Sequence, residues 1–332
     1  MQETPEQMRL KDRKLMLRLK NTKVKEIVAE KRRLVEVPYI ANLADTINTL
    51  VANRVVAVPV AAPPGQWIGA GGSMILEADK LTGAVRKHYI GMVTMLDILA
   101  HIAGDDSVNG GDETGDLDRK FVLDCMEVLS KGIHRAMVPL DSQEENKPGV
   151  ELLESASSYR MLTQMDVIKF VKAHAQQDFQ DILSRTVRDS GGLTTTVFAV
   201  TNQTKAIDAI RCMRSASLLA VPGFGRKLVG TFSATDIRGC PIAALQPWLQ
   251  LNVIDFTSRV FENPSYGAPD LVNSPRLLVT CRLDSLLTDV IDKVVTTHVH
   301  RVWVTNDDGA LLGLVSLTDI IRAIRTVVIA DS

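Results

Sequence analysis

One short motif returns four times along the chain, and it constrains the fold more than any other feature of the sequence. Each copy has an apolar stretch that leads to Ser or Thr, an Asp three residues later, and a further apolar stretch. The copies cover residues 91–98, 160–167, 230–237 and 313–320. Their hydroxyl residues, at positions 94, 163, 233 and 316, are 69, 70 and 83 residues apart. This recurrence predicts four copies of one small α/β unit, because self-similarity at a long period is typical of repeat architectures.

The residues around two of the motifs predict the rest of the unit. In the fourth copy, strand, helix, strand, strand and helix are expected in this order at residues 277–279, 286–295, 302–304, 311–315 and 320–327. Residues 306–309 read NDDG, which favours a hairpin turn between the last two strands. The first copy begins in the same order, with strands at 34–37 and 55–60 around a helix with apolar residues at helical spacing from Leu43 to Val51. Each unit is therefore expected to be β-α-β-β-α.

The remaining segments predict the domain organisation. We expect an N-terminal helix (1–19), a first repeat (20–103), a flexible acidic and glycine-rich linker (104–117), a second repeat (118–176), a third repeat (182–242), a connecting segment (243–269) and a fourth repeat (270–330). Residues 63–88 are expected to form a long exposed loop, because their glycines lack the G-x-G-x-x-G spacing of a phosphate loop. Residues 141–157 are a similar insertion. Four apolar residues of the connecting segment are expected to pack against the body: Trp248, Leu251, Val253 and Phe256.

The N-terminal residues predict a helix with two alternative roles. Thr4 is a suitable N-cap, Pro5 suits the first helical position, and Gln7 completes a capping box. Its apolar stripe is expected to comprise Met8, Leu15, Met16 and Leu19, among many Lys and Arg residues. This helix either packs on the first repeat or docks on a partner or an acidic surface.

Charge and cysteine usage exclude several classes of protein. With a formal net charge of −1, we expect no binding to nucleic acid or to a membrane surface. No apolar run approaches the roughly 18 residues of a membrane helix, and the charged N-terminus is not typical of a signal peptide. The four cysteines form no C-x-x-C pair, so no zinc or redox motif is expected. Scattered free thiols favour a reducing compartment, cytoplasmic and/or nuclear.

The repeated motif suits two purposes. A helix N-terminus attracts anions, so a hydroxyl there can donate to a phosphate while the Asp accepts the hydroxyls of a ribose. The candidate phosphate-binding hydroxyls are Thr94, Thr163, Ser233 and Ser316, and the candidate ribose-binding carboxylates are Asp97, Asp166, Asp236 and Asp319. The alternative is structural, since Ser or Thr followed by Asp at this spacing is also a capping box.

Basic residues distinguish the repeats from one another. His134 and Arg135 stand before the second strand of the second repeat, and His300 and Arg301 stand there in the fourth, whereas the first and third repeats have Val56 and Leu219 at the first of these positions. A His-Arg pair beside a helix N-terminus can neutralise phosphate. A solvated strand end, or a histidine bonded to backbone, is the alternative. If nucleotides bind, the fourth repeat is the first candidate, and His298 is nearby.

These motifs resemble CBS repeats, which pair into Bateman modules. Four of them with His-Arg before the second strand resemble the gamma subunit of AMP-activated protein kinase. The acidic linker, the insertion in the first repeat and the sequence Pro247-Trp248-Leu249-Gln250 are most similar to the plant gamma-subunit-like CBS proteins.

The resemblance implies an α/β fold in which the first repeat pairs with the second, the third pairs with the fourth, and the two modules form a disc. It also implies that adenine nucleotides (AMP, ADP or ATP) bind in clefts, with the aspartates on ribose, the hydroxyls on phosphate, and His134 and His300 facing phosphate. Arg160 replaces the usual glycine of the motif, and it either fills the second cleft or grips phosphate.

The expected function is therefore a non-catalytic regulatory subunit of a serine/threonine kinase complex, with a catalytic alpha subunit, a beta scaffold subunit and an adenine nucleotide as partners. A stand-alone CBS sensor of adenosyl ligands, or a ligand-free scaffold that regulates another enzyme or a transporter, is the alternative. No cofactor and no metal site are expected, and an enzyme is not expected because the sequence has no nucleophile–base motif, metal-ligand spacing or P-loop.

Overall fold

The computed structural model describes most of the chain. The described residues are 17–62, 67–68, 74–75, 89–103, 122–139, 159–175, 179–215, 220–222, 228–262 and 278–330. The predicted linker, the insertion at 141–157 and the predicted cap of the N-terminal helix lie outside these residues. Of the loop predicted at 63–88, two short strands are described, β3 (Trp67–Ile68) and β4 (Met74–Ile75), which pair antiparallel.

The first repeat follows the predicted order. Its elements are β1 (Val37–Pro38), α3 (Leu43–Ala52), β2 (Ala57–Ala61), β5 (Tyr89–Thr94) and α4 (Met95–Ile102). They form a sheet in the order β1-β2-β5, with β1 parallel and β5 antiparallel to β2. Helix α3 begins after Asn42, whose side chain accepts a hydrogen bond from the backbone N–H of Asp45. Ile47 and Leu50 then turn one face of the helix into the core.

The fourth repeat has the same topology. Its elements are β10 (Thr280–Cys281), α12 (Leu287–Thr297), β11 (Arg301–Thr305), β12 (Leu311–Ser316) and α13 (Leu317–Ala330). The predicted hairpin between β11 and β12 is confirmed: Asn306 Oδ1 accepts the backbone N–H of Ala310 at 2.7 Å, and Gly309 has a φ of +79°. The first strands were predicted too early. They begin at Val37 rather than residue 34, and at Thr280 rather than residue 277, because the parallel pairing with β2 and β11, and not the apolar run, sets their position.

The second and third repeats are shorter in the part of the chain that the structure describes. The second comprises α5 (Val122–Ser130), β6 (Arg135–Pro139), β7 (Tyr159–Thr163) and α6 (Gln164–Ala173), and the third comprises α9 (Ala206–Ser215), β8 (Ala220–Pro222), β9 (Thr231–Ser233) and η1 (Ala234–Gly239). Each forms a two-stranded sheet there. The third motif opens a 3₁₀-helix instead of the expected longer helix. Pro241 explains this difference, because a proline disfavours helical backbone in the residue before it.

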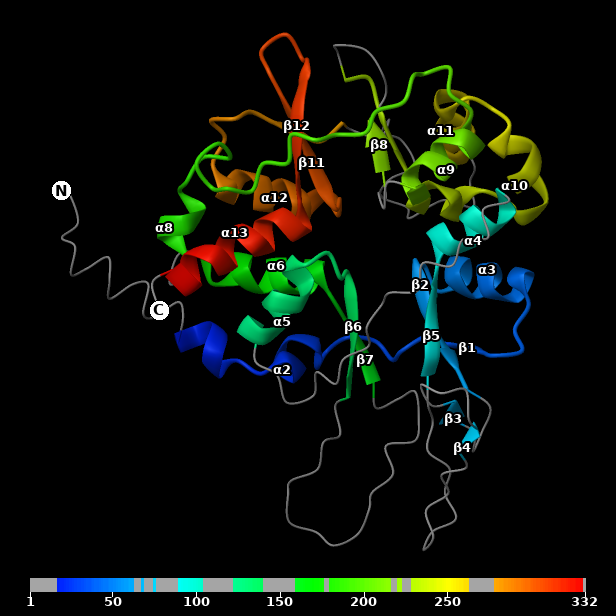
Figure 1. The fold of residues 1–332 in the computed structure, drawn as a ribbon, viewed down its shortest axis with the longest axis horizontal. Coiled ribbons are helices and arrows are strands. Elements are labelled where there is room, and N and C mark those ends of the chain that lie inside the picture. Colours follow the sequence, from blue (N-terminus) through cyan, green and yellow to red (C-terminus); the bar gives the residue numbers. More distant parts are fainter. Residues whose placement is uncertain are drawn as a thin grey trace, which may run out of the picture.

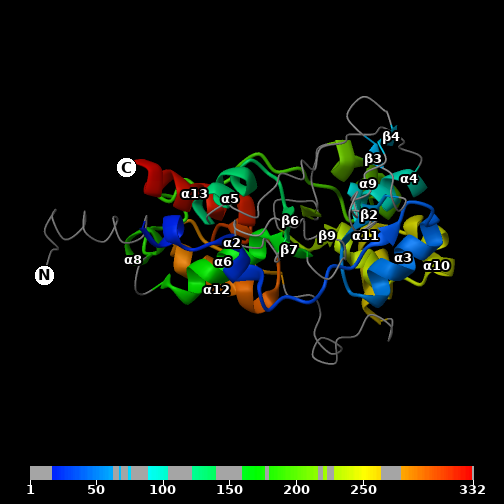
Figure 2. The same ribbon diagram turned by 90° about the horizontal axis from the view of Figure 1, so that it is seen from below.

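The four repeats share two hydrophobic cores. One core joins the helices of the second and fourth repeats, α5 and α6 with α12 and α13, and the other joins α3 and α4 of the first repeat with α9 and η1 of the third. Figure 1 shows these two groups on opposite sides of the molecule, and Figure 2 shows that together they form a flattened body. Helices therefore bring together the first repeat with the third, and the second with the fourth.

The sheets make the other contacts. The rings of Tyr89 on β5 and Tyr159 on β7 meet edge to face with centroids 5.7 Å apart, which joins the first repeat to the second. Thr194, which precedes α9, exchanges two backbone hydrogen bonds of 2.9 Å with Leu314 on β12, which joins the third repeat to the fourth. The chain is thus an α/β assembly of four similar units, in which sheets join the first to the second and the third to the fourth.

The segment before each pair packs on the second member of that pair. Helix α2 (Val24–Val28), which the sequence placed in the first repeat, is buried in the core of the second and fourth repeats. Leu19, at the end of the predicted N-terminal helix, is buried in the same core and not on the first repeat, whereas residues 1–16 of that helix lie outside the described residues. In the same way, α8 (Gln180–Leu183) contacts α12, and Val187 N–H donates to Ser285 O at 2.9 Å. Of the predicted apolar stripe, Leu19 is buried as expected, and the other three residues lie outside the described part of the chain.

The connecting segment forms two helices, α10 (Ile242–Leu249) and α11 (Val253–Glu262). Val253 and Phe256 are buried, and Trp248 and Leu251 are partly buried, in the core of the first and third repeats. The prediction that these four residues pack against the body is confirmed.

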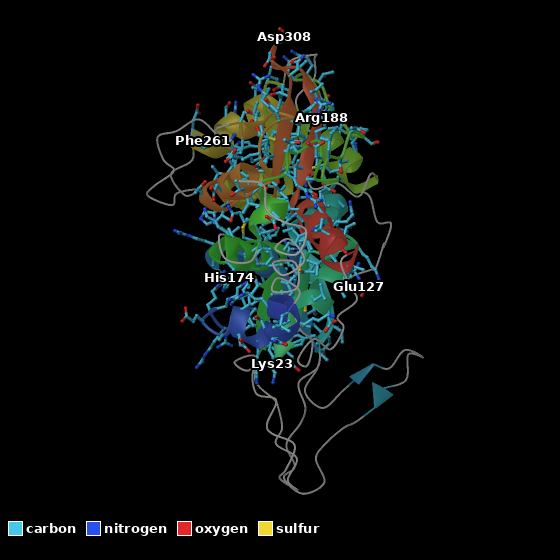
Figure 3. The ribbon with its side chains drawn as sticks, turned by 90° about the vertical axis from the view of Figure 1, so that its left-hand side faces the viewer. Lys23, Glu127, His174, Arg188, Phe261 and Asp308 are labelled. Carbon is cyan, nitrogen blue, oxygen red and sulfur yellow. The ribbon has the colours of Figure 1, made fainter. Side chains whose placement is uncertain are left out.

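Ion pairs add to the contact between α5 and α13. Glu127 on α5 lies 3.1 Å from Lys131 Nζ and 3.1 Å from Arg325 Nη2 on α13. The hydrogen bond from Lys131 and the charge of both cations lower the pKa of Glu127. Figure 3 labels Glu127 on this side of the molecule, with Asp308 at the tip of the β11–β12 hairpin and Lys23 beside α2 at the far end.

Gly313 in the fourth motif has no room for a side chain. A Cβ atom there would lie 2.5 Å from the Thr194 carbonyl oxygen, which accepts the N–H of Leu314. We therefore expect Gly313→Ala to lower the free energy of unfolding by about 1–3 kcal/mol in urea titrations, the usual cost of overpacking. Gly91, at the same place in the first motif, has no neighbour within 4 Å of such a Cβ, so Gly91→Ala is the control and should lose less than about 0.5 kcal/mol. Equal losses would contradict the contact between Thr194 and Leu314.

Candidate functional site

The strand register shows which residues are equivalent in the four motifs. In every repeat, the motif hydroxyl ends one strand and faces the first residue of the neighbouring antiparallel strand. These pairs are Ala57 with Thr94, Arg135 with Thr163, Ala220 with Ser233, and Arg301 with Ser316. An arginine therefore lies opposite the hydroxyl in the second and fourth repeats, and an alanine lies there in the first and third.

Backbone hydrogen bonds confirm the alignment one residue earlier. The first helical residue after the motif hydroxyl donates its N–H to the carbonyl of Val56, His134 or His300, at 2.9, 3.3 and 3.1 Å respectively. Leu219, the corresponding residue of the third repeat, lies outside the described residues. His134 and His300 therefore stand at the start of the strand beside the N-termini of α6 and α13, where the sequence placed them.

Each motif acts as a helix cap. The Asp Oδ2 atom accepts the backbone N–H of the motif hydroxyl residue at 2.9 Å in the first repeat, 2.7 Å in the second, 2.8 Å in the third and 3.0 Å in the fourth. In the first, second and fourth repeats the hydroxyl also donates to this oxygen, at 2.6, 2.7 and 2.6 Å. In the third, Ser233 Oγ instead lies 3.1 Å from Thr235 Oγ1. The capping alternative is therefore confirmed.

This capping geometry has a chemical consequence. Bonds of 2.6–2.7 Å between a hydroxyl and a carboxylate are short and charge-assisted. The hydroxyl proton is directed at the Asp, so a phosphate can receive it only after the hydroxyl turns away. A lone pair of the same hydroxyl meanwhile accepts the N–H of the Asp, at 3.2 Å in the first repeat and 3.1 Å in the fourth.

The fourth repeat has two arginines and a buried aspartate around its motif. Asp319 is 5 % exposed, and its Oδ1 atom accepts from Arg322 Nη1 at 2.9 Å, one helical turn on. Arg301 lies in the strand opposite Ser316. Burial lowers the pKa of Arg301 to about 10, and the charge of Asp319 opposes that shift, so this arginine is still protonated at neutral pH. His300 stands next to it and is exposed.

The second repeat presents a different arrangement. Asp166 Oδ2 forms an ion pair of 2.6 Å with Lys31 Nζ, and Arg160 Nε donates to the carbonyl oxygen of Lys31 at 2.6 Å. Arg160 Nη1 also donates to Tyr159 O at 3.0 Å. Both of these hydrogen bonds of Arg160 go to backbone carbonyl oxygens, and its two considered roles stay predictions.

A buried glutamine that sequence reasoning missed connects the second and fourth repeats. Gln164, the first residue of α6, is 4 % exposed. Its Nε2 atom donates to Leu129 O, Ile133 O and Thr318 Oγ1 at 3.1, 3.2 and 2.8 Å, and its Oε1 atom lies 3.1 Å from His134 Nδ1. The ring nitrogen of His134 donates here, because Oε1 is an acceptor only. The sequence did carry a signal, since the other motifs have Met95, Ala234 and Leu317 at this position.

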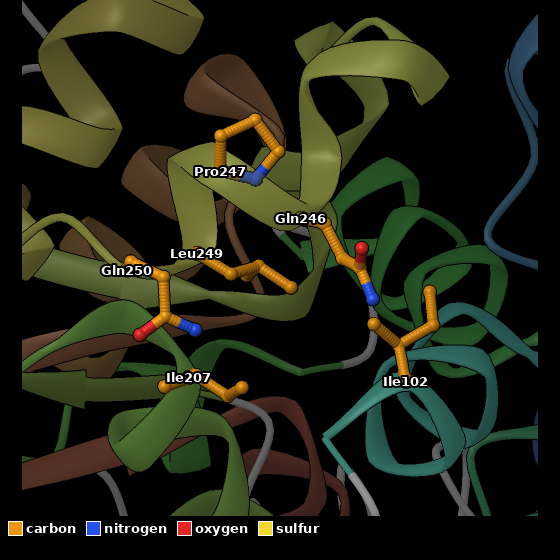
Figure 4. A pocket seen from close by; sticks show the side chains of 6 residues that line it. All are labelled: Ile102, Ile207, Gln246, Pro247, Leu249 and Gln250. Carbon is orange, nitrogen blue, oxygen red and sulfur yellow. The ribbon is translucent and has the colours of Figure 1, made fainter.

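A cavity of about 300 Å³ lies away from the motifs. It is lined by Ile102, Ile207, Gln246, Pro247, Leu249 and Gln250 (Figure 4). Ile102 ends α4, at the opposite end of that helix from Thr94 and Asp97. The cavity therefore shares no residue with the candidate nucleotide sites.

Within the described ranges, no three His, Cys, Asp or Glu residues gather as metal ligands. The four cysteines are free thiols, and burial raises the pKa of Cys240 to about 12 and that of Cys281 to about 11. No helix in the described part is both long enough and apolar enough to cross a membrane.

Comparison with known proteins identifies the family. The CBS domain model matches residues 275–326, inside the predicted fourth repeat. The SNF1-related protein kinase regulatory subunits gamma-like PV42a and PV42b of Arabidopsis thaliana are 47 % and 48 % identical to this chain; the alignments cover 93 % and 95 % of this chain and 96 % and 98 % of the relatives. The chain belongs to this gamma-like family.

The gamma-like chain also has the fold of a solved archaeal protein. Protein MJ1225 from Methanocaldococcus jannaschii superposes with a TM-score of 0.61 at 16 % identity, over 91 % of this chain and 99 % of that one. At this identity the likeness concerns the fold alone. The predicted recognition of a four-repeat CBS protein of the gamma-like kind is confirmed by the relatives and by the fold together.

Proposed function

We propose that this gamma-like chain is a non-catalytic regulatory subunit of an AMP-activated-type serine/threonine kinase complex, and that it binds an adenine nucleotide in its fourth repeat. Its partners are a catalytic alpha subunit and a beta scaffold subunit. The relatives' names, which call them regulatory subunits of SNF1-related protein kinases, support the first part. The charges of the fourth repeat support the second.

One observation carries the nucleotide assignment. In the fourth repeat, Arg301 lies opposite Ser316 at the N-terminus of α13, with His300 beside it and Asp319 one turn into the helix. The Arg301 guanidinium and the helix N-terminus provide positive charge for a phosphate, and the His300 imidazole provides an N–H donor. The Asp provides an acceptor for ribose hydroxyls once Arg322, whose side chain is 52 % exposed, moves aside. Regulation follows if the nucleotide binds two conformations of the complex with different affinity.

The nucleotide assignment predicts a loss of affinity in His300→Ala. We expect saturable binding of AMP, ADP or ATP to purified protein by calorimetry, and an affinity lower by about tenfold in the variant, which corresponds to about 1.4 kcal/mol. His300 is exposed, so the variant should fold normally.

The matched control is His298→Asn. His298 is an exposed histidine two residues away with a φ of +54°, a conformation that Asn tolerates. It should bind like the wild type. No binding of any adenine nucleotide or of S-adenosylmethionine by folded protein would contradict the nucleotide assignment and favour a ligand-free scaffold, an outcome consistent with motifs whose donors and acceptors already satisfy one another. Failure to co-purify with kinase alpha and beta subunits would contradict the regulatory assignment separately.

A further inference from the structure

Asp166 in the second repeat already holds a cation that the chain supplies. Its Oδ2 atom accepts the Thr163 N–H and hydroxyl, both at 2.7 Å, and the Lys31 ammonium at 2.6 Å. Lys31 Nζ also donates to Met161 O at 2.6 Å. The ammonium is thus fixed between the carboxylate that resembles a ribose-binding group and a carbonyl of β7, in the preceding strand.

Arg160 secures the same lysine from its backbone. Its Nε atom donates to Lys31 O at 2.6 Å. Arg160 stands where the other three motifs have Gly91, Gly230 and Gly313. The two contacts are reciprocal: Lys31 reaches the motif with its side chain, and the motif reaches Lys31 through Arg160. Lys31 and Asp166 are 135 positions apart in the sequence, and Lys31 and Arg160 are 129 apart.

Burial makes this ion pair stronger than an ordinary surface pair. The Lys31 side chain is 30 % exposed and the Asp166 side chain 15 %, so both charges are partly removed from solvent screening. Val24 and Val28, which are 1 % and 0 % exposed, anchor the preceding helix in the core of the second and fourth repeats. The backbone that carries Lys31 is therefore already held in place, so the pair forms without the loss of backbone freedom that a free segment would undergo.

The fourth repeat shows the contrast. There, the cation paired with the Asp319 carboxylate is Arg322. It lies on α13 together with Asp319, and its side chain is 52 % exposed. Arg322 Nη2 also donates to Ser130 O at 3.2 Å, so Arg322 leaves by breaking one ion pair and one hydrogen bond, and its side chain is already half in solvent. Lys31 can leave only if it breaks an ion pair, the bond to Met161 O, and the alignment imposed by Arg160.

From these contacts we propose that Lys31 is a built-in occupant of the second repeat. Its ammonium takes the carboxylate and a strand carbonyl, so the second repeat binds no nucleotide. The motif acts there as a clasp that holds residues 17–33 on the second repeat. The part that concerns nucleotides rests on the proposed function of the fourth repeat, whereas the clasp does not.

A double-mutant cycle tests the clasp without any ligand. Lys31→Met, Asp166→Asn and the double variant are unfolded in urea, and the cycle removes the separate loss of the Asp166 helix cap. We expect a coupling of about tenfold in the unfolding equilibrium constant, equivalent to about 1.4 kcal/mol. The matched control is another lysine–aspartate pair, Lys172 and Asp292, which links the second and fourth repeats at 2.7 Å but has side chains 34 % and 55 % exposed. Its coupling should be at most about threefold. A Lys31–Asp166 coupling no larger than the control would overturn the proposal.

Calorimetry with AMP tests the occupancy. Asp166→Asn should leave both the number of AMP sites and their affinity as in the wild type, because Lys31 already excludes a ligand from that carboxylate. The loss of one site in Asp166→Asn would overturn the proposal. If the wild type binds no AMP at all, the proposed nucleotide function fails, and the double-mutant cycle alone then decides whether Lys31 is the occupant.

Discussion

Phe256→Ala is expected to lower the free energy of unfolding by about 3–5 kcal/mol, the range for removal of a fully buried aromatic side chain. Phe256 is 0 % exposed on α11 and meets Phe232 of β9 edge to face, with centroids 5.6 Å apart and rings at 85°. It belongs to the segment that connects the third and fourth repeats, yet it fills the core shared by the first and third repeats. Urea unfolding followed by far-UV circular dichroism measures the loss.

Ser258→Ala on the same helix is the matched control. Ser258 is exposed, so this variant should change the free energy of unfolding by less than about 0.5 kcal/mol. A loss below about 1 kcal/mol for Phe256→Ala would mean that the connecting segment lies on the body instead of completing its core. The contact between the two phenylalanine rings would then be wrong as well.

Local periodicity explains why much of the fold was predictable. The motif recurs in equivalent units, and the strand–helix–strand–strand order around it was correct for the first and fourth repeats. The hairpin at residues 306–309 followed from turn chemistry, and the burial of Phe256 followed from an apolar pattern in a segment outside the repeats. These features depend on residues close together in the sequence, so one sequence is enough to find them.

Long-range packing explains what was not predictable. The helical spacing of Val24 and Val28 gives the buried face of α2, but the covering surface comes from the second and fourth repeats. Pairing of β1 and β10 with strands more than 20 residues later sets where they begin. The contact of Lys31 with Asp166 depends on this placement, so neither residue alone indicates that the other is its partner.

The sequence predicted where the candidate site lies, but not whether its residues bind a nucleotide or only cap a helix. The equivalence of His134 and His300 is confirmed by the strand register and by the backbone bonds of α6 and α13. The same Ser/Thr-x-x-Asp spacing suits a cap and a nucleotide site, because both use a hydroxyl and a carboxylate at a helix N-terminus. The structure shows the cap in every repeat, and what differs is the cation beside each carboxylate: Lys31 at Asp166 and Arg322 at Asp319. Nucleotide binding by these residues stays a prediction.

Gln164→Leu is expected to lower the free energy of unfolding by about 2–4 kcal/mol, because leucine has a similar volume but cannot form hydrogen bonds. The substitution removes the amide group that donates to the carbonyls of Leu129 and Ile133 and to the Thr318 hydroxyl. It also removes the oxygen that accepts from His134 Nδ1. A buried polar group that loses its partner costs about 1–3 kcal/mol, and the added apolar contact of leucine offsets part of the sum. Urea unfolding of the purified chain measures the effect.

Gln180→Leu is the matched control, because Gln180 is also the first residue of a helix but is exposed. It should change the free energy of unfolding by less than about 0.5 kcal/mol. If Gln164→Leu lost no more than this control, the four hydrogen bonds would not contribute to the contact between the second and fourth repeats. A large loss would show that a single amide ties the histidine of the second repeat to the first turn of α13. A movement of His134 would then be passed through Gln164 to Thr318 in the first turn of α13, the helix capped by Ser316 and Asp319.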